Sequence, residues 1–227
     1  MLDVESVRRD FPILKRRVGE YPLVYLDSAN TSHKPRQVVD AVSSHYLEHN
    51  ANVARAMHTL GAEATAAFEG ARAKVASFIG AASADEIVFT KNASEALNLA
   101  AHTLASRLKP GDEVVVSVME HHSNIVPWHF LRERKGAVLK WLDVDDDGGI
   151  DLAALDALIG PRTKMLALTH MSNVLGAKTP AAEVVRIAHA KGVPVMLDGC
   201  QAVVHGHVDV RALDVDFYAF TGHKLYG

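Results

Sequence analysis

Short apolar segments alternate with longer amphipathic segments between residues 86 and 220, and this alternation constrains the fold more than any other feature. Apolar runs of roughly four to eight residues predict strands, and the longer segments with helical periodicity predict helices. The pattern is typical of an α/β protein whose parallel sheet is covered by helices on both faces. The expected strands are residues 86–90, 113–118, 138–144, 164–171, 193–199 and 215–220, and the expected helices are 94–108, 123–136, 152–158 and 181–192.

The region before residue 80 is predicted to contain two further helices. Pro35 suits the first turn of a helix over residues 35–49, and an alanine-rich helix over residues 62–79 ends before Gly80. The preceding sequence LVYLDSANTSHKP indicates a strand that leads into a polar turn. Because no repeat or linker interrupts the chain, we expect an N-terminal segment, residues 1–20, and one α/β domain, residues 21–227.

Composition excludes several classes of function. The formal net charge is −3 and the charged residues are interspersed, so the basic stripe that nucleic-acid binding requires is missing. No apolar run approaches the roughly 20 residues of a membrane span, and the start MLDVESVRRDFP lacks the apolar core of a signal peptide. The single cysteine, Cys200, excludes an internal disulfide framework and a multi-cysteine zinc site. We therefore expect a soluble cytoplasmic protein without a metal centre.

Polar residues follow five of the predicted strands directly. In open α/β sheets, ligands bind outside the carboxyl ends of the strands, where loops and helix N-termini converge. The residues at these five positions carry hydroxyl, imidazole, carboxylate, amide and amine groups. They are Asn92–Glu95, Glu120–Asn124, His170–Asn173, Asp198–Gln201 and Thr221–Lys224.

Lys224 and Asp198 carry the groups with the most specific chemistry. A lysine just past a buried strand, in a glycine-containing turn, becomes a nucleophile able to form a Schiff base when it loses water. A lone loop lysine is more often a solvated surface charge. A carboxylate at the end of a buried strand needs a cationic or hydrogen-bonding partner, and either a helix N-cap role or pairing with a protonated pyridine nitrogen meets that need. Both alternatives stay open for each residue.

His121 and Ser94 are weaker candidates. Adjacent residues seldom face the same way, so His121 and His122 make a poor metal pair, although one ring could lie flat on an aromatic cofactor. Surface or core histidines are the alternative. Ser94 begins a predicted helix, where backbone N–H groups and the helix dipole attract an anion, and where serine is ordinarily only a cap.

With lysine, aspartate, tandem histidine and helix-start serine in this order, the chain resembles the class V aminotransferase-like enzymes of fold type I, which use pyridoxal phosphate. Within that group it is most similar to cysteine desulfurases of the SufS/CsdA type. The segments that carry the resemblance are VRRDFPIL, YLDSANTSHKP, HTLGAEAT, MEHHSNIVPW, THMSNVLG and DGCQAVVHGHVDVRALDVDFYAFTGHKLYG. It implies the three-layer α/β/α sheet of the family's large domain.

The resemblance also implies roles for the residues that would act on the cofactor ring. Lys224 would hold pyridoxal phosphate covalently and then move the proton of the substrate's α-carbon. Asp198 would keep the pyridine nitrogen protonated, and Gln201 would hydrogen-bond the phenolic oxygen. His121 would stack on the ring and act as an acid.

A second group of residues would bind the cofactor's phosphate and the substrate. The resemblance assigns the phosphate to Ser94, Thr221 and His223, together with the backbone around Ala93. It places Asn173 near the substrate carboxylate.

The reaction implied is the conversion of L-cysteine to L-alanine, with sulfur transferred to an enzyme cysteine for iron–sulfur cluster assembly. In the family the attacking cysteine and a substrate-binding arginine follow the lysine, in regions that this sequence does not contain, so Cys200 is interpreted as a small buried thiol. A homodimer and a SufE-like sulfur acceptor are implied as partners. Two alternatives stay open: a selenocysteine lyase or another class V lyase or epimerase, and a non-catalytic fragment or interaction module.

Overall fold

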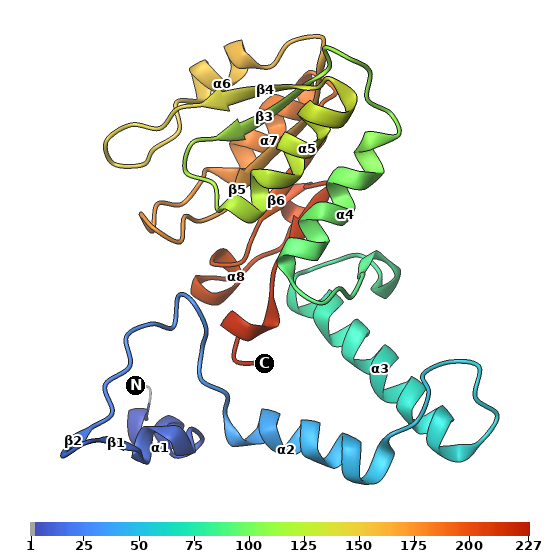
Figure 1. The fold of residues 1–227 in the computed structure, drawn as a ribbon, viewed down its shortest axis with the longest axis vertical. Coiled ribbons are helices and arrows are strands. Elements are labelled where there is room, and N and C mark those ends of the chain that lie inside the picture. The colour runs from blue at the N-terminus through green and yellow to red at the C-terminus, as the bar shows by residue number, and fades with distance from the viewer. Residues whose placement is uncertain (1–2) are drawn as a thin grey trace. The chain divides into compact units, whose positions relative to one another are not determined.

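The computed structural model of the protein describes residues 3–227 (Figure 1). These residues divide into two compact units. Residues 78–221 form the first, here called the sheet unit. Residues 3–77 and 222–227 form the second, here called the terminal unit because both ends of the chain belong to it.

The sheet unit contains a five-stranded sheet in which every strand is parallel to its neighbours. The strand order is β4-β3-β5-β6-β7, so the edge strands are β4 and β7. The three central strands are almost entirely buried and the edge strands are partly exposed, as expected for a sheet covered on both faces. The strands are β3 (Glu113–Ser117), β4 (Val138–Leu142), β5 (Thr163–Thr169), β6 (Val195–Asp198) and β7 (Phe217–Ala219).

Helices cover both faces of this sheet, and alternate residues of each strand point to opposite faces (Figure 1). Val114 and Val116 pack with Trp128 in one core cluster, to which α4 and α5 contribute. Val115 packs with Leu155 in the other cluster, to which α6 and α7 contribute. The predicted three-layer α/β/α fold is therefore confirmed.

Helices α4 to α7 agree with the predicted segments to within a few residues, whereas the four-residue helices α8 and α9 were not predicted. Residues 123–136 begin instead with a 3-10 turn, η4, and the α-helix starts near Pro127, which lies in its first turn. Gly136 ends that helix in the left-handed region, with φ 69°. The elements are η3 (Ala84–Glu86), α4 (Ala93–Ala105), η4 (His122–Asn124), α5 (Val126–Lys135), α6 (Leu152–Leu158), α7 (Ala181–Ala190), α8 (Ala202–His205) and α9 (Val210–Leu213).

The strand predicted over residues 86–90 is wrong. Residues 84–86 form the 3-10 turn η3, and residues 87–90 lie outside both sheets of the described chain. Ile87 is buried, but Val88 is 66% exposed and Phe89 is 43% exposed. An apolar run reports which side chains tend to be buried, whereas a strand also requires a neighbouring backbone in register.

The terminal unit is mainly helical, and its two long helices were predicted. The expected helix over residues 35–49 is α2, which continues into a π-helical turn, η2, and the expected helix over residues 62–79 is α3. A short antiparallel hairpin, β1 and β2, precedes them. The elements are α1 (Val4–Arg9), η1 (Pro12–Lys15), β1 (Arg17–Val18), β2 (Tyr21–Pro22), α2 (Arg36–Ser44), η2 (His45–His49), α3 (Thr59–Phe78) and η5 (Gly222–Lys224).

The strand predicted to begin at Leu23 is also wrong. The structure has only the two-residue strand β2 before this point, and residues 23–27 have no regular secondary structure. Val24 is 76% exposed and Leu26 is 93% exposed. The apolar alternation in this segment therefore does not correspond to packing within the described chain.

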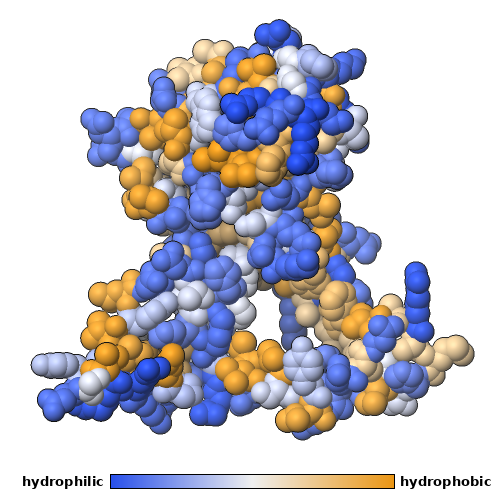
Figure 2. All heavy atoms as spheres, viewed as in Figure 1, coloured by the Kyte–Doolittle hydropathy of each residue, from blue (hydrophilic) through white to orange (hydrophobic). Residues whose placement is uncertain are grey.

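Apolar side chains are also exposed elsewhere in the terminal unit. Val39 and Val42 of α2 and Leu60 of α3 are about half exposed, and Figure 2 shows apolar surface over both helices. Within residues 3–227, no helix combines the length with the apolar character that crossing a membrane requires.

Candidate functional site

The carboxyl ends of β3 and β5 mark the point where the direction of the chain through the sheet reverses. The chain leaves β3 for β4 on one side of the sheet, and it leaves β5 for β6 and β7 on the other side. Ligands of open α/β sheets bind outside the carboxyl ends of the strands at such a switch point. Four of the five predicted polar segments follow strands β3, β5, β6 and β7, and the fifth, Asn92–Glu95, caps and begins α4.

Glu120 connects the ends of β3 and β5 through hydrogen bonds of its side chain. It is 8% exposed, and its Oε1 atom accepts the backbone N–H of Thr169, at the end of β5, at 2.8 Å. The side chain of Ser117 donates to the same oxygen, and Asn124 Nδ2 donates to Oε2 at 2.7 Å. Burial raises the pKa of Glu120 to about 7, and the charge of Asp198 adds to this effect although the three hydrogen bonds oppose it.

His121 directly follows this glutamate and caps the turn η4. Its Nδ1 atom accepts the backbone N–H of Ser123 at 3.2 Å, so the proton of the neutral imidazole lies on Nε2. The ring stacks on His122, with centroids 4.2 Å apart and planes inclined by 27°. The ring predicted to face a cofactor is thus also the one that caps the turn, and the two adjacent imidazoles lie together although they were expected to face apart.

The N-terminus of α4 lies beside η4. Asn92 caps the helix by accepting the N–H of Glu95 at 2.9 Å, and the N–H groups of Ala93 and Ser94 have no acceptor within the helix itself. Ser94 Oγ is 2.8 Å from Ser123 Oγ. Two hydroxyls and two backbone donors therefore gather at the positive end of a 13-residue helix, an arrangement that suits an anion.

Asp198 is the last residue of β6 and lies next to Thr169 in the sheet. It is 5% exposed, and its Oδ1 atom accepts the backbone N–H of Cys200 at 3.0 Å. A carboxylate accepts several hydrogen bonds on its two oxygens. Cys200 supplies one donor to this carboxylate, which has the capacity to accept further hydrogen bonds.

A pair formed by the buried His170 and the partly buried Tyr218 lies against the turn that follows Asp198. His170 Nδ1 is 2.9 Å from Tyr218 Oη, and burial together with the charge of Lys178 lowers the pKa of His170 to about 4, so the imidazole is neutral. Tyr218 covers Gly199 so closely that a Cβ atom there would lie 2.2 Å from the ring. Gly199 therefore allows the aromatic ring to support the turn that holds Asp198 and Gln201.

Three other predicted residues belong to the sheet unit. Gln201 is 5% exposed at the start of α8, and Thr221 is 8% exposed just beyond β7. Asn173 is exposed in the loop between β5 and α7. All three follow the carboxyl ends of strands, as expected.

The remaining two residues, His223 and Lys224, belong to the terminal unit. They lie in the turn η5, which is closed by hydrogen bonds from the N–H groups of Leu225 and Gly227 to the carbonyl of Gly222, at 2.8 and 3.1 Å. Lys224 is half-buried. Burial and the charges of Lys224 and Lys34 lower the pKa of His223, which favours a neutral ring.

Two side chains of the site had no predicted role of their own. Glu120 was included only as the first residue of a predicted polar segment, although a carboxylate beside two histidines after a buried strand is itself a signal. Ser123 was included only as part of a predicted segment, because its distance to Ser94 depends on how α4 and η4 pack.

Comparisons with known proteins agree with this geometry. A family model described as Aminotransferase class-V matches residues 24–227. A cysteine desulfurase from Dickeya dadantii is 52% identical over 225 residues, which are 99% of this chain and 55% of that protein. A probable cysteine desulfurase from Streptomyces coelicolor is 51% identical over 233 residues, which cover 100% of this chain and 56% of that protein.

Solved structures give the same result. The cysteine desulfurase CsdA from Escherichia coli, in an S-sulfonic acid form, has a TM-score of 0.89 and 41% identity over 100% of this chain and 56% of that chain. The apo cysteine desulfurase from Thermococcus onnurineus has a TM-score of 0.90 and 40% identity over 98% of this chain and 54% of that chain. The chain thus spans about half the length of the relatives that it matches.

Proposed function

Because the chain belongs to the class-V aminotransferase family, we propose that it forms the cofactor-binding part of a pyridoxal phosphate-dependent cysteine desulfurase. Residues 21–227 would make up the cofactor-binding domain. The observation that carries this proposal is Asp198, a carboxylate that is buried at the carboxyl end of β6 and has the capacity to accept a further donor. A protonated pyridine nitrogen is a hydrogen-bond donor whose positive charge complements the negative charge of the carboxylate.

The anion-binding end of α4 supports the same proposal. Ala93 and Ser94 would donate their N–H groups, and Ser94 its hydroxyl, to the cofactor's phosphate. Thr221 and His223, which lie close together in the sequence, would add a hydroxyl and an imidazole N–H. These are the donor types that bind phosphate in proteins.

When bound, pyridoxal phosphate supplies an electron-withdrawing ring that stabilises negative charge on the substrate carbon. The chain's own residues would hold the cofactor and transfer protons to and from the substrate. His121 carries its proton on Nε2, because Nδ1 accepts a backbone N–H, and would donate it to the substrate while lying against the ring. Lys224 would hold the cofactor covalently and move the substrate's α-proton. Gln201 would hydrogen-bond the phenolic oxygen of the cofactor.

The substrate and the partners are proposed from the relatives' names and from the resemblance. L-cysteine would be the sulfur donor, with Asn173 near its carboxylate, and the products would be L-alanine and a persulfide for iron–sulfur cluster assembly. A cytoplasmic homodimer that passes sulfur to a SufE-like acceptor is the corresponding assembly.

The test is whether Lys224 captures the cofactor. The protein is incubated with pyridoxal phosphate, reduced with borohydride and digested, and the peptide that contains Lys224 is analysed by mass spectrometry. We expect the reduced cofactor on Lys224, and we expect Lys224→Ala to lose both the modification and the absorbance retained after gel filtration. Lys135→Ala, which changes an exposed lysine at the end of α5 in the sheet unit, is the matched control. Equal retention by the wild type and Lys224→Ala would contradict the proposal.

A further inference from the structure

The backbone carbonyl that precedes Lys224 accepts hydrogen bonds from four donors. His223 O accepts Lys34 Nζ at 2.7 Å, the N–H of Ser32 at 3.0 Å, Ser32 Oγ at 3.1 Å and Thr31 Oγ1 at 3.2 Å. A carbonyl oxygen has two lone pairs, so four donors exceed what an ordinary turn provides. All four come from three residues about 190 positions earlier in the sequence.

Two further contacts hold the same turn. Ser32 Oγ accepts the N–H of Tyr226 at 2.9 Å, and His223 Nδ1 lies 3.3 Å from Thr31 Oγ1. The residues on both sides of Lys224 are therefore attached to residues 31–34. We call Thr31, Ser32 and Lys34 the carbonyl clamp.

The carbonyl clamp lies in a segment that is ordered by its own hydrogen bonds. Tyr25 Oη donates to the carbonyl of Thr31 at 2.8 Å, and Asn30 Nδ2 donates to Asp27 Oδ1 at 2.7 Å. The ring of Tyr25 stacks on His33, with centroids 4.0 Å apart. A rigid segment is what a positioning device requires, because a mobile one would transmit no fixed direction to the turn it contacts.

Lys34 provides the charged member of the clamp. Its ammonium group also donates to the carbonyl of Ser32 at 2.8 Å, and burial lowers its pKa. Hydrogen bonds from an ionised donor are about twice as strong as neutral ones. A partly buried cation that binds two carbonyls of different segments joins those segments more firmly than a neutral donor would.

We propose that the carbonyl clamp positions Lys224, with Lys34 as its main element, by holding the His223 carbonyl so that the Lys224 side chain leaves the backbone in one direction. This inference rests on the proposed role of Lys224 as the residue that captures the cofactor. Capture joins the lysine nitrogen to the aldehyde carbon as a C=N bond and releases one water. It is fast only when the amine is held near the line of attack.

The test compares an aldehyde with a ligand that cannot react. Lys34→Met removes the charge and the hydrogen bonds while keeping an unbranched chain. We expect it to slow the capture of pyridoxal phosphate, followed by absorbance, by about 10-fold, because one charge-assisted contact is lost. The affinity for pyridoxamine phosphate, which has no aldehyde, should stay within about twofold of the wild type. A role of Lys34 in overall stability alone would weaken both ligands together.

Three controls separate the possible outcomes. Lys34→Arg restores a cationic donor and should recover most of the rate, and Lys15→Met removes an exposed lysine of the same unit and should have no effect. The third control uses the cofactor-free protein and measures the rate at which Lys224 is acylated, by peptide mass spectrometry. This rate should differ from the wild type in Lys34→Met and not in Lys15→Met.

These measurements distinguish a failure of the proposed function from a failure of the clamp inference. If the wild type and Lys224→Ala bind pyridoxal phosphate alike, the proposed function is wrong. If the wild type captures the cofactor through Lys224 and Lys34→Met does so at the same rate, the clamp inference is wrong.

Discussion

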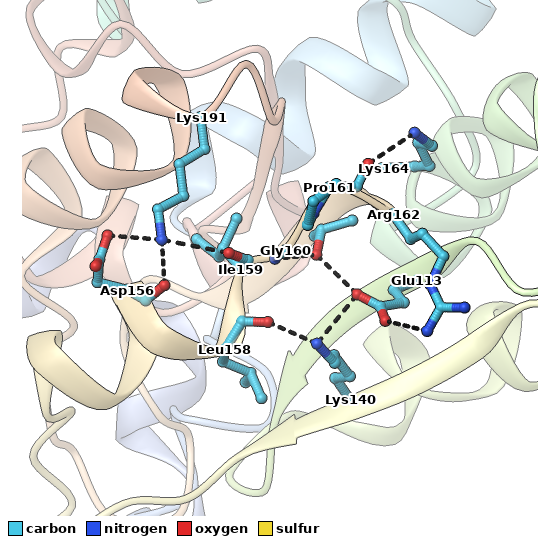
Figure 3. A network of polar contacts seen from close by, with 11 residues as sticks. Glu113, Lys140, Asp156, Leu158, Ile159, Gly160, Pro161, Arg162, Lys164 and Lys191 are labelled. Carbon is cyan, nitrogen blue, oxygen red and sulfur yellow. Dashed lines mark hydrogen bonds and ion pairs between the residues drawn. The ribbon is translucent and has the colours of Figure 1, made fainter.

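The two ends of strand β3 each carry a buried glutamate, and the two carboxyl groups have opposite surroundings. Glu113, at the start of β3, contacts Lys140 Nζ at 3.1 Å and Arg162 Nη2 at 3.4 Å (Figure 3). It also accepts a hydrogen bond from Thr163 Oγ1 at 3.1 Å. Glu120, just past the other end, contacts neutral donors and experiences the charge of Asp198. The two side chains are buried to a similar degree, but their partners differ.

The pKa values of these glutamates move in opposite directions. Burial favours the neutral form of Glu113, but the hydrogen bonds from Lys140 and Thr163 and the charges of Lys140 and Arg162 outweigh it, so its pKa is lowered. Burial dominates at Glu120, and its pKa rises to about 7. The amino-end glutamate is thus a structural ion pair, whereas the carboxyl-end glutamate is a costly group retained where the candidate site lies.

The largest expected effect is on the pH dependence of stability at the carboxyl end. Because the pKa of Glu120 is raised from 4.5 to about 7, the folded protein binds this proton more tightly than the unfolded chain does. The contribution of Glu120 to the free energy of unfolding should therefore fall by about 3 kcal/mol as pH rises from about 4.5 to 8. Glu120→Gln should remove that decline.

Urea unfolding of the wild type and Glu120→Gln at several pH values measures this difference. The amide also faces Asn124 Nδ2, itself a donor, so a loss of stability that does not depend on pH is expected in addition. If the free energy of unfolding changed with pH in the same way for the two proteins, Glu120 would not be the group that titrates.

A smaller effect is expected at the amino end, where the stabilisation that the glutamate provides increases with pH instead of decreasing. Glu113→Gln should lower the free energy of unfolding by roughly 2 kcal/mol at neutral pH, because it leaves the partly buried Lys140 without its counter-charge. The folded pKa of Glu113 is lowered, so its stabilisation is present above the unfolded pKa of 4.5 and is lost as pH falls through the folded pKa. The difference between the two proteins should shrink in acid.

Urea unfolding at pH 4 and 7 measures this effect, and Glu133→Gln, at an exposed position of α5, is the control, with an expected change under about 0.5 kcal/mol. Retention of pyridoxal phosphate should be unchanged in Glu113→Gln. A loss of cofactor there would break the distinction between a structural end and a binding end of the sheet.

The smallest effect concerns the hydroxyl pair at the carboxyl end. Ser123→Ala removes the partner of Ser94 Oγ, and we expect the affinity for pyridoxal phosphate to fall about fivefold, close to 1 kcal/mol. Fluorescence titration measures it. Ser106→Ala, at the other end of α4, should leave the affinity unchanged. A Ser123→Ala protein that binds normally would mean that Ser94 needs no orientation by its neighbour.

Much of the fold was predictable because the periodicity of apolar residues reports burial. Strands β3, β5 and β6 are apolar runs between polar turns, and both of their faces are covered by helices. Residues 86–90 have the same pattern and are not a strand, because pairing depends on a neighbouring backbone that a local pattern does not contain.

The candidate site was predictable in part for a similar reason. Asp198 and Ser94 were found from their positions at a strand end and a helix start, which are local features. The bond from Thr169 to Glu120 joins residues 49 positions apart, and the contacts of Lys34 with the His223 carbonyl span 189 positions. No short sequence window holds both partners of such a bond.

Local sequence is thus sufficient to specify most of the elements of this α/β fold and the residue types that end its strands, because burial and capping act over a few residues. It does not specify the chemical state of those residues. Glu113 and Glu120 are the same amino acid seven positions apart, and distant residues make one an ion pair and the other an acid with a pKa of about 7. Tertiary contacts make this difference, because the energy of a buried charge depends on which groups the folded chain places within a few ångströms of it.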